Sequence, residues 1–198
     1  PDTGTVGDGL VGLSWCDAAG NPFKQVAPGA RAFTKTGYDG LGRAAAVYMG
    51  YDLNETTADL YDEGGAARLH LDGSTIVEQS ESLVDGAGNS IGTVSRQRRH
   101  DATGTGALTT PGGAQPRARV TYAGSWFDPL GRQIAAAEFG TGPFDRTAPE
   151  NESAPARSDT ALVTETVYNA RGEAAETVAP TGRIDRQAFD DAGRSVKT

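Results

Sequence analysis

The hexapeptide Tyr38-Asp39-Gly40-Leu41-Gly42-Arg43 recurs along the chain. Full copies are Phe127-Asp128-Pro129-Leu130-Gly131-Arg132 and Phe189-Asp190-Asp191-Ala192-Gly193-Arg194, and a weaker copy is Tyr168-Asn169-Ala170-Arg171-Gly172-Glu173. Two decayed copies keep the polar residues and lose the ring: Cys16-Asp17-Ala18-Ala19-Gly20-Asn21 and Val84-Asp85-Gly86-Ala87-Gly88-Asn89. The copies begin at positions 16, 38, 84, 127, 168 and 189, so their spacing clusters near one or two multiples of about 21 residues. Such a period indicates an array of small repeated units.

Each copy has the residue preferences of a tight turn between two strands. Asp at the first turn position accepts a hydrogen bond from the backbone two residues further on. Gly at the fourth position tolerates the left-handed conformation that returns the chain to a strand. Pro129 stands at the second turn position, where its fixed φ suits a type I turn. The segments 26–29 and 178–182, each with Pro and Gly between two copies, predict turns that close the other end of a hairpin.

The segments around the turns have strand character. The segment 161–168 is rich in β-branched residues, and 183–189 alternates along its length. No stretch keeps a helical period over three turns, so the Ala-rich segments that follow two of the turns are also interpreted as strands. Predicted hairpins pair 75–84 with 91–99 around Asp85, and 117–127 with 133–139 around Asp128.

The sequence therefore predicts an all-β fold, an array of antiparallel β-hairpins that forms a curved open sheet. The whole chain, 1–198, is expected to be a single array, with loops at about 51–74, 100–116 and 141–160. It begins with Pro1 and has its only methionine at position 49, so we expect a fragment of a longer repeat region.

Composition excludes several classes of function. With 27 glycines and 37% hydrophobic residues, the chain suits short strands and tight turns better than a thick helical core. A net charge of −8 disfavours phosphate backbones, so nucleic acid is not an expected partner. One cysteine allows neither an intrachain disulfide nor a multi-cysteine metal site. No apolar run of 18 residues occurs, so no membrane span is expected.

No catalytic constellation is visible in the sequence, so an enzyme is not expected, and neither is a cofactor or a metal. The basic segment 96–100 divides its arginines between two strand faces. Glu150, Glu152 and Asp159 lie in a Pro/Ala/Ser-rich segment that does not hold them at a fixed separation. No Gly-x-Ser-x-Gly nucleophile motif occurs.

The predicted site is structural and consists of the repeat residues themselves. The rings are expected to pack at strand ends, and the arginines to pair with turn carboxylates or to stack on neighbouring rings. A ligand-stacking role for the same aromatic residues is the alternative. The predicted repeat residues are Tyr38, Asp39, Gly42, Arg43, Asp85, Gly88, Phe127, Asp128, Gly131, Arg132, Tyr168, Gly172, Phe189, Asp190, Gly193 and Arg194.

The pattern aromatic-Asp-x-x-Gly-Arg, with a unit near 21 residues, resembles the YD repeat of the RHS family. The segment 168–196 is similar to the whole family unit, 16–48 is nearly so, and the middle of the chain is looser. The resemblance implies a sheet of hairpins that spirals into a hollow shell. In polymorphic toxins and insecticidal toxin complexes, that shell encloses a toxic C-terminal polypeptide. In teneurin-like proteins it forms an adhesive extracellular body, and bacterial wall-associated members are linked to carbohydrate binding.

One segment resembles part of the self-cleaving core of family shells. Asp128-Pro129-Leu130-Gly131 continues with Arg132, however, and no second copy lies nearby. It is therefore interpreted as an ordinary repeat turn that contains proline.

The expected function is a non-catalytic wall segment of an RHS-type shell or cell-surface protein, which encapsulates or displays a C-terminal toxin-like domain. Expected partners are the neighbouring repeats of the same chain and an encapsulated polypeptide or a glycan. The resemblance implies an extracellular or bacterial cell-surface location. The alternative is a carbohydrate- or cell-surface-binding module, which an exposed row of aromatic residues on one sheet face would favour.

Overall fold

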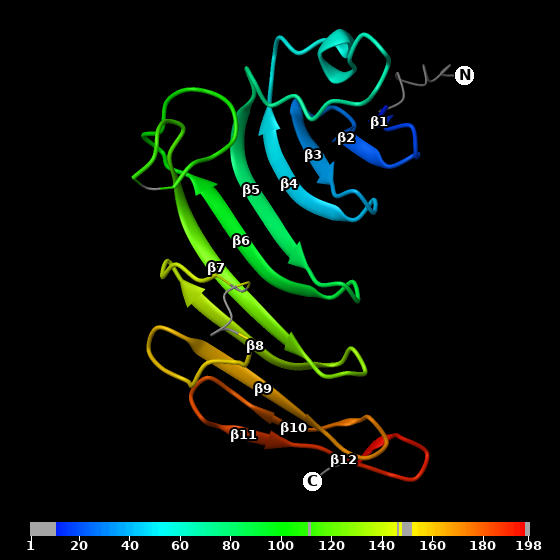
Figure 1. Ribbon diagram of the computed structural model, residues 1–198, viewed down its shortest axis with the longest axis vertical. Helices are drawn as coiled ribbons and strands as arrows, with labels where there is room; N and C mark the ends of the chain where they lie inside the picture. The colour runs from blue at the N-terminus through cyan, green and yellow to red at the C-terminus, as the bar shows by residue number, and fades with distance from the viewer. Residues whose placement is uncertain (1–10, 111, 146, 148–151, 197–198) are drawn as a thin grey trace, which may run out of the picture. The chain divides into compact units, whose positions relative to one another are not determined.

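The computed structural model describes residues 11–110, 112–145, 147 and 152–196. Strands dominate the fold, and the main sheet has eleven of them, hydrogen-bonded in sequence order from β1 to β11 (Figure 1). The sheet does not close, because β1 and β11 are its two ends. The predicted all-β array of antiparallel hairpins is confirmed. The strands are β1 Leu13–Cys16, β2 Pro22–Val26, β3 Ala32–Tyr38, β4 Ala44–Tyr51, β5 Thr75–Val84, β6 Ser90–Arg98, β7 Ala118–Phe127, β8 Gln133–Gly140, β9 Leu162–Tyr168, β10 Ala174–Val178 and β11 Ile184–Arg186.

Three smaller elements complete the described structure. β12 (Ala188–Phe189) and β13 (Ser195–Val196) form a separate two-stranded sheet, and η1 (Thr57–Leu60) is a 3-10 turn between β4 and β5. Among the described residues, no helix is long and apolar enough to cross a membrane.

The connections between strands are of two kinds. The hexapeptide copies close the hairpins β1–β2, β3–β4, β5–β6, β7–β8, β9–β10 and β12–β13. At the other ends of the strands, the predicted Pro/Gly turns join β2 to β3 and β10 to β11. Longer insertions join the remaining strands at 52–74, 99–117 and 141–161, close to the predicted loop positions. The Ala-rich segments after the turns form β4 and β8, because pairing within a hairpin overrides their helix propensity.

The strand predicted at 183–189 is wrong as one continuous element. β11 ends at Arg186, and the Gln187 N–H still donates to the Ala175 carbonyl at 2.9 Å. From Ala188 the chain pairs instead with β13, on the other side of the Asp190 turn. The alternating sequence 183–189 does not reveal this change of partner at Gln187.

The chain divides into two compact units, each with its own core. The first comprises Pro1–Glu81 and Arg96–Arg119, and the second Ser82–Ser95 and Val120–Thr198. In the first unit the buried cluster is Phe33, Tyr48, Ile76, Leu108 and Ala118. Leu108 comes from the insertion 99–117, and its N–H donates to the Gln79 side-chain oxygen at 2.8 Å. This insertion therefore completes the core of its unit.

The second unit buries Trp126, Ala135, Ala137, Ala161 and Val163. Its insertion 141–161 contributes Phe144, whose ring stacks on Phe139 with centroids 3.8 Å apart. Gly124 makes room for this ring, since a Cβ at that position would lie 2.8 Å from a Phe144 ring atom. Because Gly124 of β7 has no side chain, the insertion can pack against the sheet at this position.

Candidate functional site

The turn at Asp39 shows how one repeat closes. The Asp39 N–H donates to the Arg43 carbonyl, and the Gly42 N–H donates to the Asp39 carbonyl, both at 2.9 Å. One Asp39 carboxylate oxygen accepts the N–H groups of Leu41 and Arg43, and the other accepts Arg43 Nε at 2.8 Å. Gly42 has a φ of +76°, which is the left-handed conformation expected at this position. The aspartate therefore holds a type I turn and its glycine bulge with a single side chain.

The other copies repeat this geometry with different closing residues. Asp128 and Asp190 bind the Nε of Arg132 and Arg194 at 2.7 and 2.8 Å. Asp17 and Asp85 bind the side-chain amides of Asn21 and Asn89 at 3.0 and 2.9 Å. The side chain at the fifth position of these turns therefore donates to the second carboxylate oxygen of the aspartate.

At the weaker copy the two roles are exchanged. The Asn169 side-chain oxygen accepts the N–H groups of Arg171 and Glu173. Its amide nitrogen then donates to the Glu173 carboxylate at 2.6 Å. The acid and the donor have changed places, and the backbone of the turn is unchanged.

These bonds keep the turn aspartates ionised. The backbone N–H and the side chain of the closing arginine lower the pKa of Asp39 and Asp128 below the ordinary 3.8. The Arg194 N–H lowers the pKa of Asp190 in the same way. At Asp17 and Asp85, the asparagine side chain is the largest cause of the lowered pKa. Saturated, ionised carboxylates of this kind suit a structural role better than proton transfer.

Consecutive turns contact one another within each unit. The Tyr38 hydroxyl donates to the Pro22 carbonyl, and the Tyr168 hydroxyl donates to the Gln133 carbonyl, both at 3.0 Å. Pro22 and Gln133 are the residues that begin the strand after the preceding turn. The Arg132 guanidinium also lies 4.5 Å from the centre of the Tyr168 ring. A tyrosine at the motif's first position thus binds the turn before it.

Glycines of the motif also lie close to the turn that precedes them. A Cβ at Gly172 would lie 3.4 Å from the Arg132 guanidinium, and one at Gly193 would lie 3.2 Å from the Glu173 carboxylate. We call these contacting turns the turn stack. It contains the turns at Asp17 and Asp39 in the first unit, and those at Asp85, Asp128, Asn169 and Asp190 in the second.

The structure shows a further copy of the repeat turn, in a segment whose sequence predicts a turn but which was not counted among the repeat copies. In Tyr61-Asp62-Glu63-Gly64-Gly65-Ala66, the Asp62 N–H donates to the Ala66 carbonyl, and the Gly65 N–H to the Asp62 carbonyl, both at 2.9 Å. Ala66 replaces the closing donor, and the hairpin is reduced to one bridge between Tyr61 and Ala67. Its ring, Asp and Gly were the available signal, and its position divides the long interval between the copies at 38 and 84.

The aromatic residues are mostly packed rather than displayed. Every phenylalanine, tyrosine and tryptophan of the chain lies within the described residues, and only Tyr51 is exposed, at 44%. The rings of the turns, Tyr38, Phe127, Tyr168 and Phe189, are all half-buried. The described faces of the sheet therefore carry no exposed row of rings.

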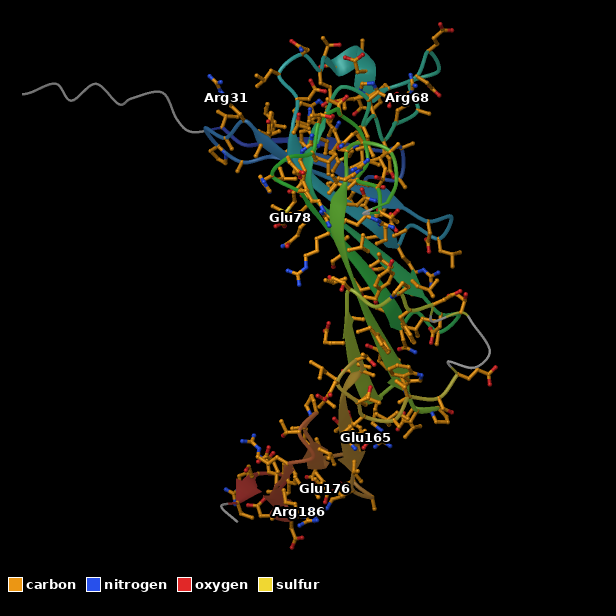
Figure 2. The ribbon with its side chains drawn as sticks, turned by 90° about the vertical axis from the view of Figure 1, so that its left-hand side faces the viewer. Arg31, Arg68, Glu78, Glu165, Glu176 and Arg186 are labelled. Carbon is orange, nitrogen blue, oxygen red and sulfur yellow. The ribbon has the colours of Figure 1, made fainter. Side chains whose placement is uncertain are left out.

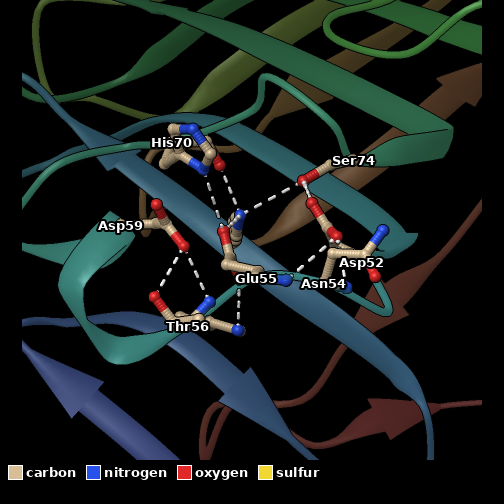
Figure 3. A network of polar contacts seen from close by, with 9 residues as sticks. Asp52, Asn54, Glu55, Thr56, Asp59, His70 and Ser74 are labelled. Atoms are coloured by element: carbon tan, nitrogen blue, oxygen red, sulfur yellow. Dashed lines mark hydrogen bonds and ion pairs between the residues drawn. The ribbon is translucent and has the colours of Figure 1, made fainter.

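A buried network of charges anchors the insertion 52–74 in the first unit. The Glu55 carboxylate is 1% exposed and pairs with Lys24 of β2 and Lys35 of β3. Lys35 is fully buried, and its ammonium also donates to the His70 carbonyl. His70 Nδ1 lies 3.3 Å from Glu55, on the opposite side from the Asp52–Ser74 contact (Figure 3). The network joins an insertion to two strands through its charges.

Burial and pairing act in opposite directions on these groups. Burial lowers the pKa of Lys35, although the Glu55 carboxylate counteracts it. Burial also opposes ionisation of Glu55, but the hydrogen bonds from Lys24 and Lys35 outweigh it, so that the pKa of Glu55 is lowered overall. Glu55 therefore stays ionised, and its enclosure leaves it no access to a substrate.

Sequence reasoning did not find this cluster, because its charged residues are far apart in the chain. It expected no convergence of polar groups, and the structure shows one between Lys24, Lys35, Glu55 and His70. The only available signal was a lysine in the middle of each of two neighbouring strands. Among the described residues, no three His, Cys, Asp or Glu side chains are placed to hold a metal ion.

Two arginines of the basic segment 96–100 have local partners. Arg96 lies 2.8 Å from Glu81, and Arg98 donates to the carbonyls of Ala102 and Gly104. Glu152 and Asp159 are exposed, and Glu150 lies outside the described residues.

The fold and the turns together define a β-hairpin repeat protein whose units close through an Asp-x-x-Gly turn. No protein-family model matches the chain, and no curated protein matches it. Among solved structures, the chain is similar to the crystal structure of TcdB2-TccC3-Cdc42, with 11% identity and a TM-score of 0.45. It is also similar to TcdB2-TccC3-TEV, with 12% identity and a TM-score of 0.43. In both, the likeness covers 93% of this chain and 9% of the other, so the chain spans a small part of those proteins.

Proposed function

We infer that the chain is a non-catalytic wall segment of an RHS-type repeat protein, located outside the cell or at its surface. The observation that carries this inference is the turn stack. The two tyrosines of the motif donate to the preceding turn, and the motif glycines donate their N–H groups within their own turns. Residues committed to such contacts hold neighbouring hairpins together and are not free to bind a substrate.

The binding-module alternative finds less support. A surface that binds glycans by stacking needs exposed rings, and among the described residues only one phenylalanine, tyrosine or tryptophan, Tyr51, is exposed. The buried Glu55 network is closed to ligands by its own burial. The wall segment is therefore the function that these features favour.

The test uses the native parent polypeptide from the producing cells. Intact mass and peptide mapping give its length, and limited proteolysis shows whether a non-repeat domain is protected. A long product with many more repeats, whose non-repeat C-terminal domain resists protease until the wall unfolds, is the expected result. A native product of only this length, or a domain cleaved as fast as it is when free, would overturn the wall proposal.

A further inference from the structure

The first unit has a sheet face on which neither of its described insertions packs. Both insertions lie on the other face, because Leu71 and Leu108 contact the buried cluster there. Side chains alternate along a strand, so Glu78 points away from that cluster, whereas Gln79 binds the Leu108 N–H beside it. Figure 2 shows Glu78 and Arg68 of the insertion 52–74 on opposite sides of the strands. We call the side of Glu78 the uncovered face.

Three arginines come together on the uncovered face, at the end of β6 and the start of β7. The Arg99 N–H donates to the Arg117 carbonyl at 3.1 Å, which places these two residues opposite one another. Ala118 is buried in the cluster on the other face, so Arg117 and Arg119 on either side of it project from the uncovered face. Arg98 donates to carbonyls of the insertion 99–117, so Arg99 points the opposite way. We call Arg99, Arg117 and Arg119 the arginine patch.

The positive charge of the arginine patch is not neutralised by the part of the chain that the structure describes. All three residues are exposed, and none forms an ion pair with a described carboxylate. Arg117 Nε donates to the Gly113 carbonyl at 3.2 Å, and this neutral partner leaves the charge in place. Like charges directly opposite one another on two strands are destabilising, so Arg99 and Arg117 repel each other. An anion bound between them would relieve this repulsion.

The spacing of the arginine patch favours one kind of anion. Arg117 and Arg119 are two residues apart on one strand, so their side chains leave the face about 6.7 Å apart. Alternate side chains of an extended peptide have the same spacing, so two carboxylates separated by one residue can each meet one guanidinium. The whole chain carries a charge of −8 and repels acidic partners in general, so binding has to come from this local match.

We propose that the arginine patch binds an acidic polypeptide segment in extended conformation, with carboxylates at alternate positions. One carboxylate lies between Arg99 and Arg117, and the next meets Arg119. The inference goes beyond the wall function and does not depend on it. The basic segment 96–100 did not predict this site, because Arg117 and Arg119 lie on the far side of an insertion.

The test is a titration of the ¹⁵N-labelled chain with a short capped peptide in which glutamate and threonine alternate. We expect shifts at the Nε groups of the arginine patch and at the amides next to them. Arg119→Gln should weaken binding about threefold, the size of one exposed ion pair, and Arg117→Gln combined with Arg119→Gln about tenfold. A peptide of the same composition that repeats Glu-Glu-Thr-Thr has no two glutamates two residues apart. It should bind about threefold more weakly than the alternating peptide, because only one carboxylate is in place.

Arg68→Gln is the matched control, because Arg68 is exposed in the same unit and lies on the other side of the strands (Figure 2). This variant should bind like the unchanged chain. Equal losses from Arg68→Gln and Arg119→Gln would overturn the site, since net charge alone would then attract the peptide. Equal affinity for the two peptides, or no shift at millimolar peptide, would overturn it as well. Tighter binding of a sulfated polysaccharide than of the alternating peptide, at equal concentration of charge, would overturn the peptide in favour of a glycan.

Discussion

The two units fasten an insertion to the sheet in opposite ways. In the first, the insertion 52–74 is held by Glu55 between two buried lysines. In the second, the insertion 141–161 is held by Phe144, stacked on Phe139 and seated over Gly124. A buried carboxylate depends on every one of its partners, whereas a packed ring loses contacts by degrees. We therefore expect the loss of one partner to cost more stability at the ionic anchor than at the packed ring.

The largest effect is expected from Glu55→Ala. This change leaves Lys24 and Lys35 without their shared carboxylate, and breaking a buried pair typically costs about 3–5 kcal/mol. Urea unfolding of the purified chain measures the loss. Glu63→Ala, at an exposed position of the same insertion, should change stability by less than about 0.5 kcal/mol. A loss below about 1 kcal/mol for Glu55→Ala would mean that the ion network does not anchor the insertion.

A smaller effect is expected from Phe144→Ala in the second unit. Full truncation of a buried phenylalanine costs about 3–5 kcal/mol, and because Phe144 is half-buried we expect about 2 kcal/mol. Phe144→Leu keeps apolar volume and removes only the ring contacts, so it should cost about 1 kcal/mol. Urea midpoints of both variants test the order. A Phe144→Leu variant as stable as the wild type would show that the stacking on Phe139 contributes nothing beyond burial.

Low pH should remove the contribution of the Glu55 anchor to stability and leave that of Phe144 unchanged. The folded pKa of Glu55 lies below its ordinary 4.5, so its contribution is present in full above about pH 4.5 and is lost as pH falls through the folded pKa. Urea midpoints from pH 7 to pH 2.5 should therefore converge for the wild type and Glu55→Gln. Phe144→Ala should stay below the wild type by a constant amount, because no proton is involved. A constant gap for Glu55→Gln would contradict the charge assignment.

The smallest effect belongs to the turns, which both units share. Gly88 has a φ of +94° with open space around it, so Gly88→Ala should cost about 1 kcal/mol through backbone strain alone. Gly86, two residues earlier in the same turn, also has open space but no positive φ. Gly86→Ala should be neutral or slightly stabilising. Thermal midpoints of the two variants compare them directly, and equal losses would exclude the left-handed position as the cause.

Local chemistry made most of the fold predictable. The Asp and Gly positions at Asp39 and Asp128 identify turns from residue preference alone, and the strands on either side follow from them. Ala135 and Ala137 lie in a strand against their helix propensity because the preceding turn dictates pairing. The arginine bonds were likewise expected from the motif, since donor and acceptor lie within one turn.

The contacts that the sequence did not predict join residues that lie far apart along the chain. Lys24, Lys35 and Glu55 meet only after two strands pair and an insertion folds back over them. The turn at Asp62 was not counted as a repeat copy because no strand pattern precedes Tyr61. The packing of Phe144 depends on Gly124 in β7, and no local sequence pattern links the two residues.

The exchanged pair at Asn169 and Glu173 has a consequence for how such repeats can diverge. Changing Asn169 to aspartate alone would set two carboxylates side by side, and changing Glu173 to arginine alone would leave two donors facing each other. Each single step passes through a poorer turn, and only both together recover the usual arrangement. We therefore expect the two positions to change together, and both arrangements occur in this one chain.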